Sequence, residues 1–192
     1  MGRVIVLQAE IARDPDPRTE RELLERLPYA RRLELERREV AARRASLVAV
    51  GLVLRGASRL LGRKVDVGAL RFPQDGKPWC RDGPCFSVSH TARRVAVALS
   101  MDCELGIDLE DVPAERTSGG ETLARLEQWT ATEATLKAAG LGLRDVRHVD
   151  FDVDRATATC QGATYFVQRL DLAPDVVSAL ATATPTESVL VY

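Results

Sequence analysis

The spacing of hydrophobic positions changes along the chain and predicts alternating strands and helices. A mostly apolar run at residues 4–8 has the length of a strand. A capping box at residues 19–22 predicts a short helix that reaches about residue 27. Over residues 39–61, apolar positions recur mostly at helical spacing without a proline, which predicts a long amphipathic helix ending near Gly62.

Short strands dominate the chain beyond Gly62. The pattern predicts them over residues 69–72, 86–89, 95–100 and 104–109, and again over 149–153, 164–170, 176–180 and 189–191. A second helix is predicted over residues 123–139, ended by Gly140 and Gly142. Strand, helix and short strands therefore occur twice, which predicts an α+β fold with a boundary around residues 100–104.

The net charge of −1 conceals a strong asymmetry. Residues 1–100 carry 20 basic and 12 acidic side chains, a balance of +8, and residues 101–192 carry 7 and 16, a balance of −9. Many of the basic side chains are arginines in or just before the long predicted helix, where a solvated helical face is the plain interpretation. The alternative is that one half binds phosphate and the other a cation.

Composition and cysteine usage indicate a cytoplasmic globular protein. No stretch approaches the ~20 apolar residues that a membrane span needs, so no membrane contact is expected. The four cysteines form no CxxC pair, which favours free, inert thiols over a disulfide framework. The two histidines do not lie at zinc-ligand spacing from a cysteine pair.

The first segment with candidate chemistry is the acidic run that follows Gly106. Residues two apart in a strand point the same way, so Asp108 and Glu110 are expected on one face, about 7 Å apart. Two neighbouring carboxylates repel unless a cation lies between them, and Mg²⁺ binds such groups together with substrate phosphates. The plain alternative is a solvent-facing acidic edge.

Two further segments carry candidate phosphate-binding groups. Glu133 and Lys137 are four apart on the second predicted helix, where they either form an intrahelical ion pair or contact a metal and a phosphate. Gly76-Lys77-Pro precedes Phe-Ser-Val-Ser89-His90-Thr at a predicted strand end, where hydroxyl and imidazole groups could meet an anion. A serine hydrolase is disfavoured, because no GxSxG nucleophile elbow is present.

In this order, the segments Gly-Lys-Pro, Phe-Ser-Val-Ser-His-Thr, Gly-Ile-Asp-Leu-Glu and Trp-x-x-x-Glu-Ala-x-x-Lys-Ala resemble the 4′-phosphopantetheinyl transferases. The similarity is to the larger, pseudo-dimeric class that activates surfactin synthetase, and it runs from the arginine-rich helix to about residue 153. It implies two similar α+β subdomains, 1–103 and 104–192, each with a long helix packed on a small, mainly antiparallel sheet. It also implies a monomer with the active site between the halves.

The resemblance implies an activity and a role for each matching residue. Coenzyme A would donate its phosphopantetheine arm to a serine of an acyl or peptidyl carrier protein, releasing adenosine 3′,5′-bisphosphate. Glu133 would deprotonate that serine, directly or through a metal-bound water. Asp108, Glu110 and Glu133 would be the Mg²⁺ ligands, and Lys137 would contact the transferred phosphate or the leaving group. The residues that would bind the nucleotide phosphates are Arg44, Lys77, Ser89 and His90.

Two departures from the family pattern keep an alternative open. Thr132 stands where the family usually has a lysine directly before the metal-binding glutamate, and only 20 residues separate Asp108 from Trp129. The alternative is a family member that binds coenzyme A or a carrier domain without transfer. A nucleic-acid-binding module is disfavoured, because the acidic half would repel a phosphate backbone and no stacking aromatics lie among the arginines.

Overall fold

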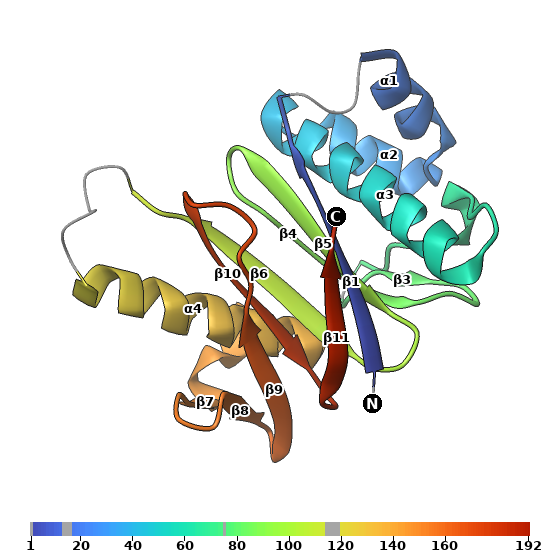
Figure 1. Ribbon diagram of the computed structural model, residues 1–192. Helices are drawn as coiled ribbons and strands as arrows, with labels where there is room; N and C mark the ends of the chain where they lie inside the picture. Colours follow the sequence, from blue (N-terminus) through green and yellow to red (C-terminus); the bar gives the residue numbers. More distant parts are fainter. Residues whose placement is uncertain (1, 13–16, 75, 114–119) are drawn as a thin grey trace.

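The computed structural model describes residues 2–12, 17–74, 76–113 and 120–192 (Figure 1). The helices are α1 (Pro17–Arg26), α2 (Tyr29–Glu36), α3 (Val40–Leu61) and α4 (Gly120–Ala138), with 3₁₀ turns η1 (Val67–Ala69) and η3 (Leu143–His148). The strands are β1 (Gly2–Glu10), β2 (Leu70–Arg71), β3 (Trp79–Cys80), β4 (Cys85–His90), β5 (Arg94–Ser100), β6 (Leu105–Asp111), β7 (Val149–Asp152), β8 (Thr157–Cys160), β9 (Ala163–Arg169), β10 (Val176–Thr182) and β11 (Thr186–Val191). The predicted α+β fold is confirmed.

Two sheets pack face to face between two long helices. The first sheet has the order β11-β1-β5-β4 and the second β6-β10-β9-β8-β7. Alternate residues of β1 divide between two cores: Ile5 and Leu7 pack with α3, whereas Val4 and Val6 pack with β6 and β10. A third core joins α4 to the outer face of the second sheet. The layers therefore run α3, first sheet, second sheet, α4 (Figure 1).

The C-terminal strand joins the sheet that contains the N-terminus. β11 pairs in parallel with β1, with Val4 opposite Val189 and Val6 opposite Val191. These residues are far apart along the chain and lie on opposite sides of the boundary that the sequence places at residues 103 and 104. The first sheet is thus built from both predicted segments.

The long helices begin and end close to where the sequence places them. Helix α3 ends at Leu61, and Gly62 follows it in the left-handed conformation (φ 62°), which a glycine adopts without strain. The short strands β3 and β8 were not predicted. Between Asp108 and Trp129, residues 114–119 lie outside the described residues.

The cysteines are free thiols, as their spacing in the sequence predicts. All four cysteine thiols are free, and Cys80, Cys103 and Cys160 are buried. In the described part of the chain, no helix combines the length and apolarity that crossing a membrane would require.

Candidate metal centre and adjoining cavities

Strand β6 presents its carboxylates toward helix α4. Leu105, Ile107 and Leu109 enter the core between the two sheets, so the intervening residues face the other way. Asp108 and Glu110 therefore share the face that α4 covers, as the two-residue period predicts. Asp108 is only 2% exposed, and this excludes the interpretation of this residue as part of a solvent-facing acidic edge.

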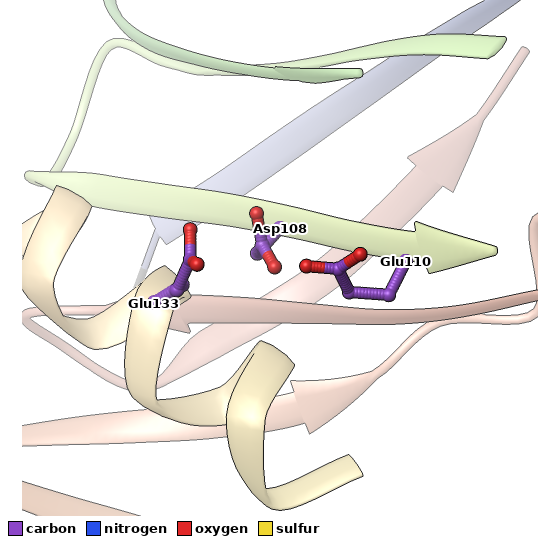
Figure 2. A group of neighbouring side chains, drawn as sticks. All are labelled: Asp108, Glu110 and Glu133. Carbon is purple, nitrogen blue, oxygen red and sulfur yellow. The ribbon is translucent and has the colours of Figure 1, made fainter. Parts of the chain in front are cut away.

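Helix α4 supplies the third carboxylate. Trp129, Glu133 and Lys137 are each four residues apart, so they follow one another along the same side of the helix. One oxygen each from Asp108, Glu110 and Glu133 lies within 4.8 Å of the others. Figure 2 shows the three side chains turned toward one space between β6 and α4. The predicted carboxylate set is thus brought together.

Gly106 permits the close approach of α4 to β6. A Cβ atom at this position would lie 2.0 Å from the Ala134 carbonyl oxygen and 2.5 Å from the Ala138 amide nitrogen. Both are helix backbone atoms, which cannot rotate away as a flexible side chain can. The glycine of the Gly-Ile-Asp motif therefore sets the spacing between the strand and the helix that carry the carboxylates.

The edges of the two sheets meet beside this cluster. The backbone N–H of Ile107 donates to Ser87 Oγ at 3.1 Å, and the Ser89 hydroxyl donates to Asp108 Oδ1 at 2.7 Å. Strand β4 is thus joined to β6 through serine hydroxyls. The hydroxyl of Ser89, which is expected to contact nucleotide phosphate, lies at the carboxylate cluster.

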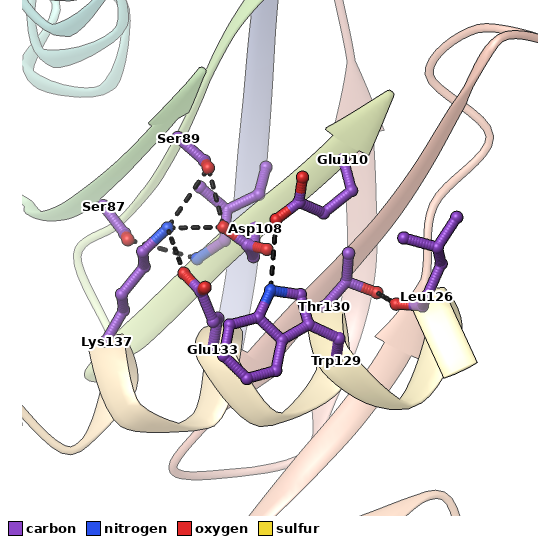
Figure 3. A network of polar contacts seen from close by, with 10 residues as sticks. Ser87, Ser89, Asp108, Glu110, Leu126, Trp129, Thr130, Glu133 and Lys137 are labelled. Carbon is purple, nitrogen blue, oxygen red and sulfur yellow. Dashed lines mark hydrogen bonds and ion pairs between the residues drawn. The ribbon is translucent and has the colours of Figure 1, made fainter. Parts of the chain in front are cut away.

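Lys137 is the cation within the cluster (Figure 3). Its Nζ lies 2.5 Å from Asp108 Oδ1, 3.1 Å from Ser89 Oγ and 3.8 Å from Glu133 Oε2. The contact with Asp108 on β6 is shorter than the intrahelical contact with Glu133. Lys137 therefore links helix α4 to strand β6, in addition to its contact within α4.

The donor set fits a hard divalent cation. Three carboxylates and one ammonium leave a formal charge of −2 in a largely enclosed space. Asp108 Oδ2 is buried, and among the described residues it has no hydrogen-bond partner. A buried charged oxygen without a partner is costly, and Mg²⁺, which prefers carboxylate oxygens, would satisfy it.

The electrostatics of the cluster disfavour three free carboxylates. Burial and then the nearby Asp108 raise the pKa of Glu133, with the Lys137 ammonium opposing them. Burial and then Asp108 also raise the pKa of Glu110, which the Trp129 indole N–H and Lys137 partly offset. Both groups thus favour protonation more than an ordinary carboxyl group does.

These shifts predict how the metal-free protein responds to pH. A raised carboxyl pKa contributes stability that is present below the ordinary value, about 4.3, and is lost as pH rises through the raised pKa. In EDTA, we expect Glu133→Gln to raise the Tm relative to wild type at pH 8 more than at pH 5. The neutral amide removes a charge that burial and Asp108 oppose.

Mg²⁺ is expected to raise the Tm of the wild-type protein more than that of Glu133→Gln. At 100 times its Kd, a ligand of the folded state adds about 2.7 kcal/mol, so the wild-type Tm is expected to rise when Mg²⁺ replaces EDTA. Glu133→Gln is expected to lose most of that rise, whereas Glu187→Gln, an exposed change on β11, is expected to keep it. An equal rise in Tm on adding Mg²⁺ to all three proteins would contradict the assignment of this metal site.

Two cavities lie near opposite ends of β6. The first, about 380 Å³, is lined by Lys77, Ser87 and Lys137 together with neighbouring residues. Lys77 Nζ donates to the Leu105 carbonyl oxygen at 2.6 Å, at the first residue of the strand. The first cavity is thus lined by residues from three motifs, which are those of Lys77, Ser89 and Lys137.

The second cavity, about 600 Å³, is rich in arginine. Arg44, Arg93 and Arg94 line it, and Arg93 also lies 3.6 Å from Asp111 at the last residue of β6. Arg44 thus lies at this cavity and not in the carboxylate cluster, and it also makes an ion pair with Glu20 at 3.9 Å. His90 is exposed at the end of β4.

Comparison with known proteins adds no family to this geometry. The chain matched neither a protein-family model nor a curated protein. The functional argument therefore rests on the residues and their arrangement.

Three contributors to the site had no role assigned from the sequence: Gly106, Ser87 and Trp129. The spacing of Trp129 relative to Glu133 and Lys137 is a signal that could have placed the indole on the cluster side of α4. The contribution of Ser87 depends on the meeting of two sheet edges, and no local pattern signals that.

Proposed function

We propose that the protein is a Mg²⁺-dependent 4′-phosphopantetheinyl transferase. It transfers the phosphopantetheine arm of coenzyme A to a serine of an apo acyl or peptidyl carrier protein in the cytoplasm. Adenosine 3′,5′-bisphosphate is the second product.

The observation that carries this proposal is the convergence of four separate motifs. The acidic motif of β6 and the Glu133–Lys137 motif of α4 form the carboxylate cluster, and Ser89 of the third motif bonds to it. Lys77 of the fourth motif shares a cavity wall with Lys137. The sequence resemblance requires these motifs to act on one pyrophosphate, and their proximity supports that requirement.

The chain's own residues suit a displacement at phosphorus. The serine oxygen forms a bond to the phosphorus nearer pantetheine, and the bond to the bridging oxygen breaks, which leaves the electron pair on the departing bisphosphate. Glu133 accepts the serine proton, directly or through a water molecule. Lys137 lies between the cluster and the first cavity, where its ammonium can stabilise the negative charge of the reacting phosphates.

Asp108, Glu110 and Glu133 would hold the metal. When bound, Mg²⁺ neutralises pyrophosphate charge and so supports the transfer. Arg44 and His90 would bind nucleotide phosphate groups away from the reacting phosphorus, with Lys77 at the other cavity.

We further infer that the two halves form a pseudo-dimer that acts as a monomer. The order helix, sheet, sheet, helix supports this arrangement, because each long helix covers the outer face of one sheet. The carboxylate cluster lies where the edge strands β4 and β6 meet, which is consistent with a site between two halves.

Thr132 motivates a second candidate, a protein that binds coenzyme A or a carrier domain without transfer. The Thr132 hydroxyl donates to the Gln128 carbonyl oxygen of its own helix at 2.8 Å. It therefore does not replace the amine of the lysine that the family usually has there. Lys137 would have to supply the cationic contact to phosphate by itself.

Product release distinguishes these two candidates. Coenzyme A, Mg²⁺ and an apo carrier protein are incubated with the protein, and adenosine 3′,5′-bisphosphate is quantified by chromatography. The proposal predicts release that requires both Mg²⁺ and the acceptor serine, with a Ser→Ala carrier as control. Coenzyme A binding without release, across several carriers, would favour the second candidate.

Arg44→Ala is expected to weaken coenzyme A binding more than turnover. The substitution removes a guanidinium from the arginine-lined cavity, some distance along the site from Glu133 and Lys137. Loss of one charge-assisted contact, worth roughly 1.5–3 kcal/mol, predicts a KM for coenzyme A that is higher by about 10-fold or more. Steady-state kinetics measure this change, with kcat within about threefold of wild type.

Arg37→Ala provides the matched control, since Arg37 is an exposed arginine just before α3. Its KM is expected to stay at the wild-type value. Equal effects of the two substitutions would show that general basic charge, rather than the Arg44 cavity, attracts coenzyme A.

A further inference from the structure

We propose that Trp129 is a positioning residue of the metal centre, which holds the Glu110 carboxylate through its indole N–H. The inference rests on the proposed function only in treating the three carboxylates as a metal site. It concerns how this chain prepares one of those ligands before the cation arrives.

The three carboxylates differ in how they are held. Lys137 contacts both Asp108 and Glu133, and Ser89 also donates to Asp108. Glu110 lies near the end of β6, and the Trp129 Nε1–H donates to its Oε1 at 3.1 Å. Figure 3 shows the indole lying along the cluster, with its nitrogen directed at Glu110.

This contact counteracts a specific electrostatic problem. Glu110 is repelled by Asp108, and a free glutamate has several rotamers that would move its carboxylate away from the cluster. A neutral donor fixes one oxygen without adding a positive charge that would compete with the cation. A carboxylate has about four lone-pair sites, so Glu110 can accept this hydrogen bond and still bind a cation.

The position of Trp129 indicates that this role is distinct from core packing. Its side chain is 38% exposed, so burial alone does not explain a tryptophan here. It begins the series of residues, continued by Glu133 and Lys137, that α4 directs toward β6. The same helix face thus supplies a ligand, a cation and a hydrogen-bond donor for another ligand.

Mn²⁺ titration of the purified protein, without coenzyme A or carrier, tests the inference. Free Mn²⁺ is measured by electron paramagnetic resonance for wild type, Trp129→Phe and Trp79→Phe. Loss of an outer-shell partner typically lowers metal affinity 10–100-fold, so we expect Trp129→Phe to bind Mn²⁺ about 10-fold more weakly. Trp79→Phe, which changes the other of the two tryptophans, is expected to bind as wild type does.

A second variant separates the hydrogen bond from the ring. Benzothienylalanine at position 129 replaces the indole N–H with sulfur while preserving ring size, and it is expected to reproduce the weaker Mn²⁺ binding. In the transfer assay, Trp129→Phe is expected to raise the Mg²⁺ concentration needed for half-maximal rate, with kcat at saturating Mg²⁺ largely kept. A structural defect would instead lower kcat and leave the Mg²⁺ dependence unchanged.

The outcomes separate this inference from the proposed function. If wild type binds Mn²⁺ and both position-129 variants bind it with the same affinity, the positioning role is overturned. The transferase proposal would still stand. Weaker binding in those variants, with no transfer by wild type, would support the positioning role and contradict the transferase. Absence of Mn²⁺ binding by wild type would overturn the inference together with the metal site.

Discussion

Replacing Asp108 with asparagine is expected to lower the rate of phosphopantetheine transfer by more than about 100-fold, since loss of outer-shell metal partners alone typically costs 10–100-fold. Asp108 contacts Ser89 and Lys137 and is grouped with both other carboxylates. Its buried Oδ2 becomes an amide nitrogen or oxygen in the variant, which binds a hard cation less well than a carboxylate. Initial rates at saturating coenzyme A and carrier measure the loss.

The fold is expected to survive this substitution. Asparagine has nearly the same shape, and removing the charge relieves the repulsion that adds to burial in raising the pKa values of Glu110 and Glu133. Asp171→Asn, an exposed change outside the site, serves as control and is expected to keep the wild-type rate. An Asp108→Asn protein that retains a third of the wild-type rate would exclude Asp108 as a metal ligand in transfer.

Gly106→Ala is expected to destabilise the protein by about 3 kcal/mol, at the upper end of typical overpacking costs. The new Cβ would overlap the backbone of α4 at Ala134 and Ala138, so the helix must move away from β6. For a chain of this size, the Tm is expected to fall by roughly 6–12 °C. Differential scanning calorimetry measures this change.

The same movement is expected to separate the ligands. Glu133 and Lys137 lie on the displaced helix, whereas Asp108 and Glu110 remain on β6, so Mg²⁺ affinity falls with stability. Gly51→Ala in α3 is the matched control. Its Cβ would lie 3.8 Å from the Leu23 side chain, an ordinary contact, and alanine favours helix. A Gly106→Ala protein with wild-type Tm and Mg²⁺ affinity would show that the close approach is unimportant.

Local patterns predicted the two pairs of residues that form the carboxylate cluster, and the family resemblance predicted that they meet. The two-residue period of a strand places Asp108 and Glu110 on one face, and the four-residue helical spacing groups Glu133 with Lys137. The order of motifs along the chain predicted that these pairs would meet. Burial of Asp108 and the Lys137–Asp108 contact agree with that prediction.

The remaining features depend on contacts between distant segments. Ser89 bonds to Asp108 because β4 and β6 meet at their edges, and β11 joins β1 because the chain ends return to one sheet. Neither choice of partner is encoded in a short hydrophobic period, which defines a face but not the neighbouring strand. The position of Arg44 in a separate cavity likewise follows from packing rather than from its local sequence.

Intact-mass analysis of an apo carrier protein tests the central claim most directly. The carrier is incubated with coenzyme A, Mg²⁺ and wild-type protein, in parallel with Glu133→Gln and with an EDTA control. Transfer predicts that the carrier gains the mass of one phosphopantetheine group with wild type and Mg²⁺ only, at the acceptor serine. An unmodified carrier across fatty-acid, polyketide and peptide-synthetase types at high protein concentration, or full modification by Glu133→Gln, would contradict the account.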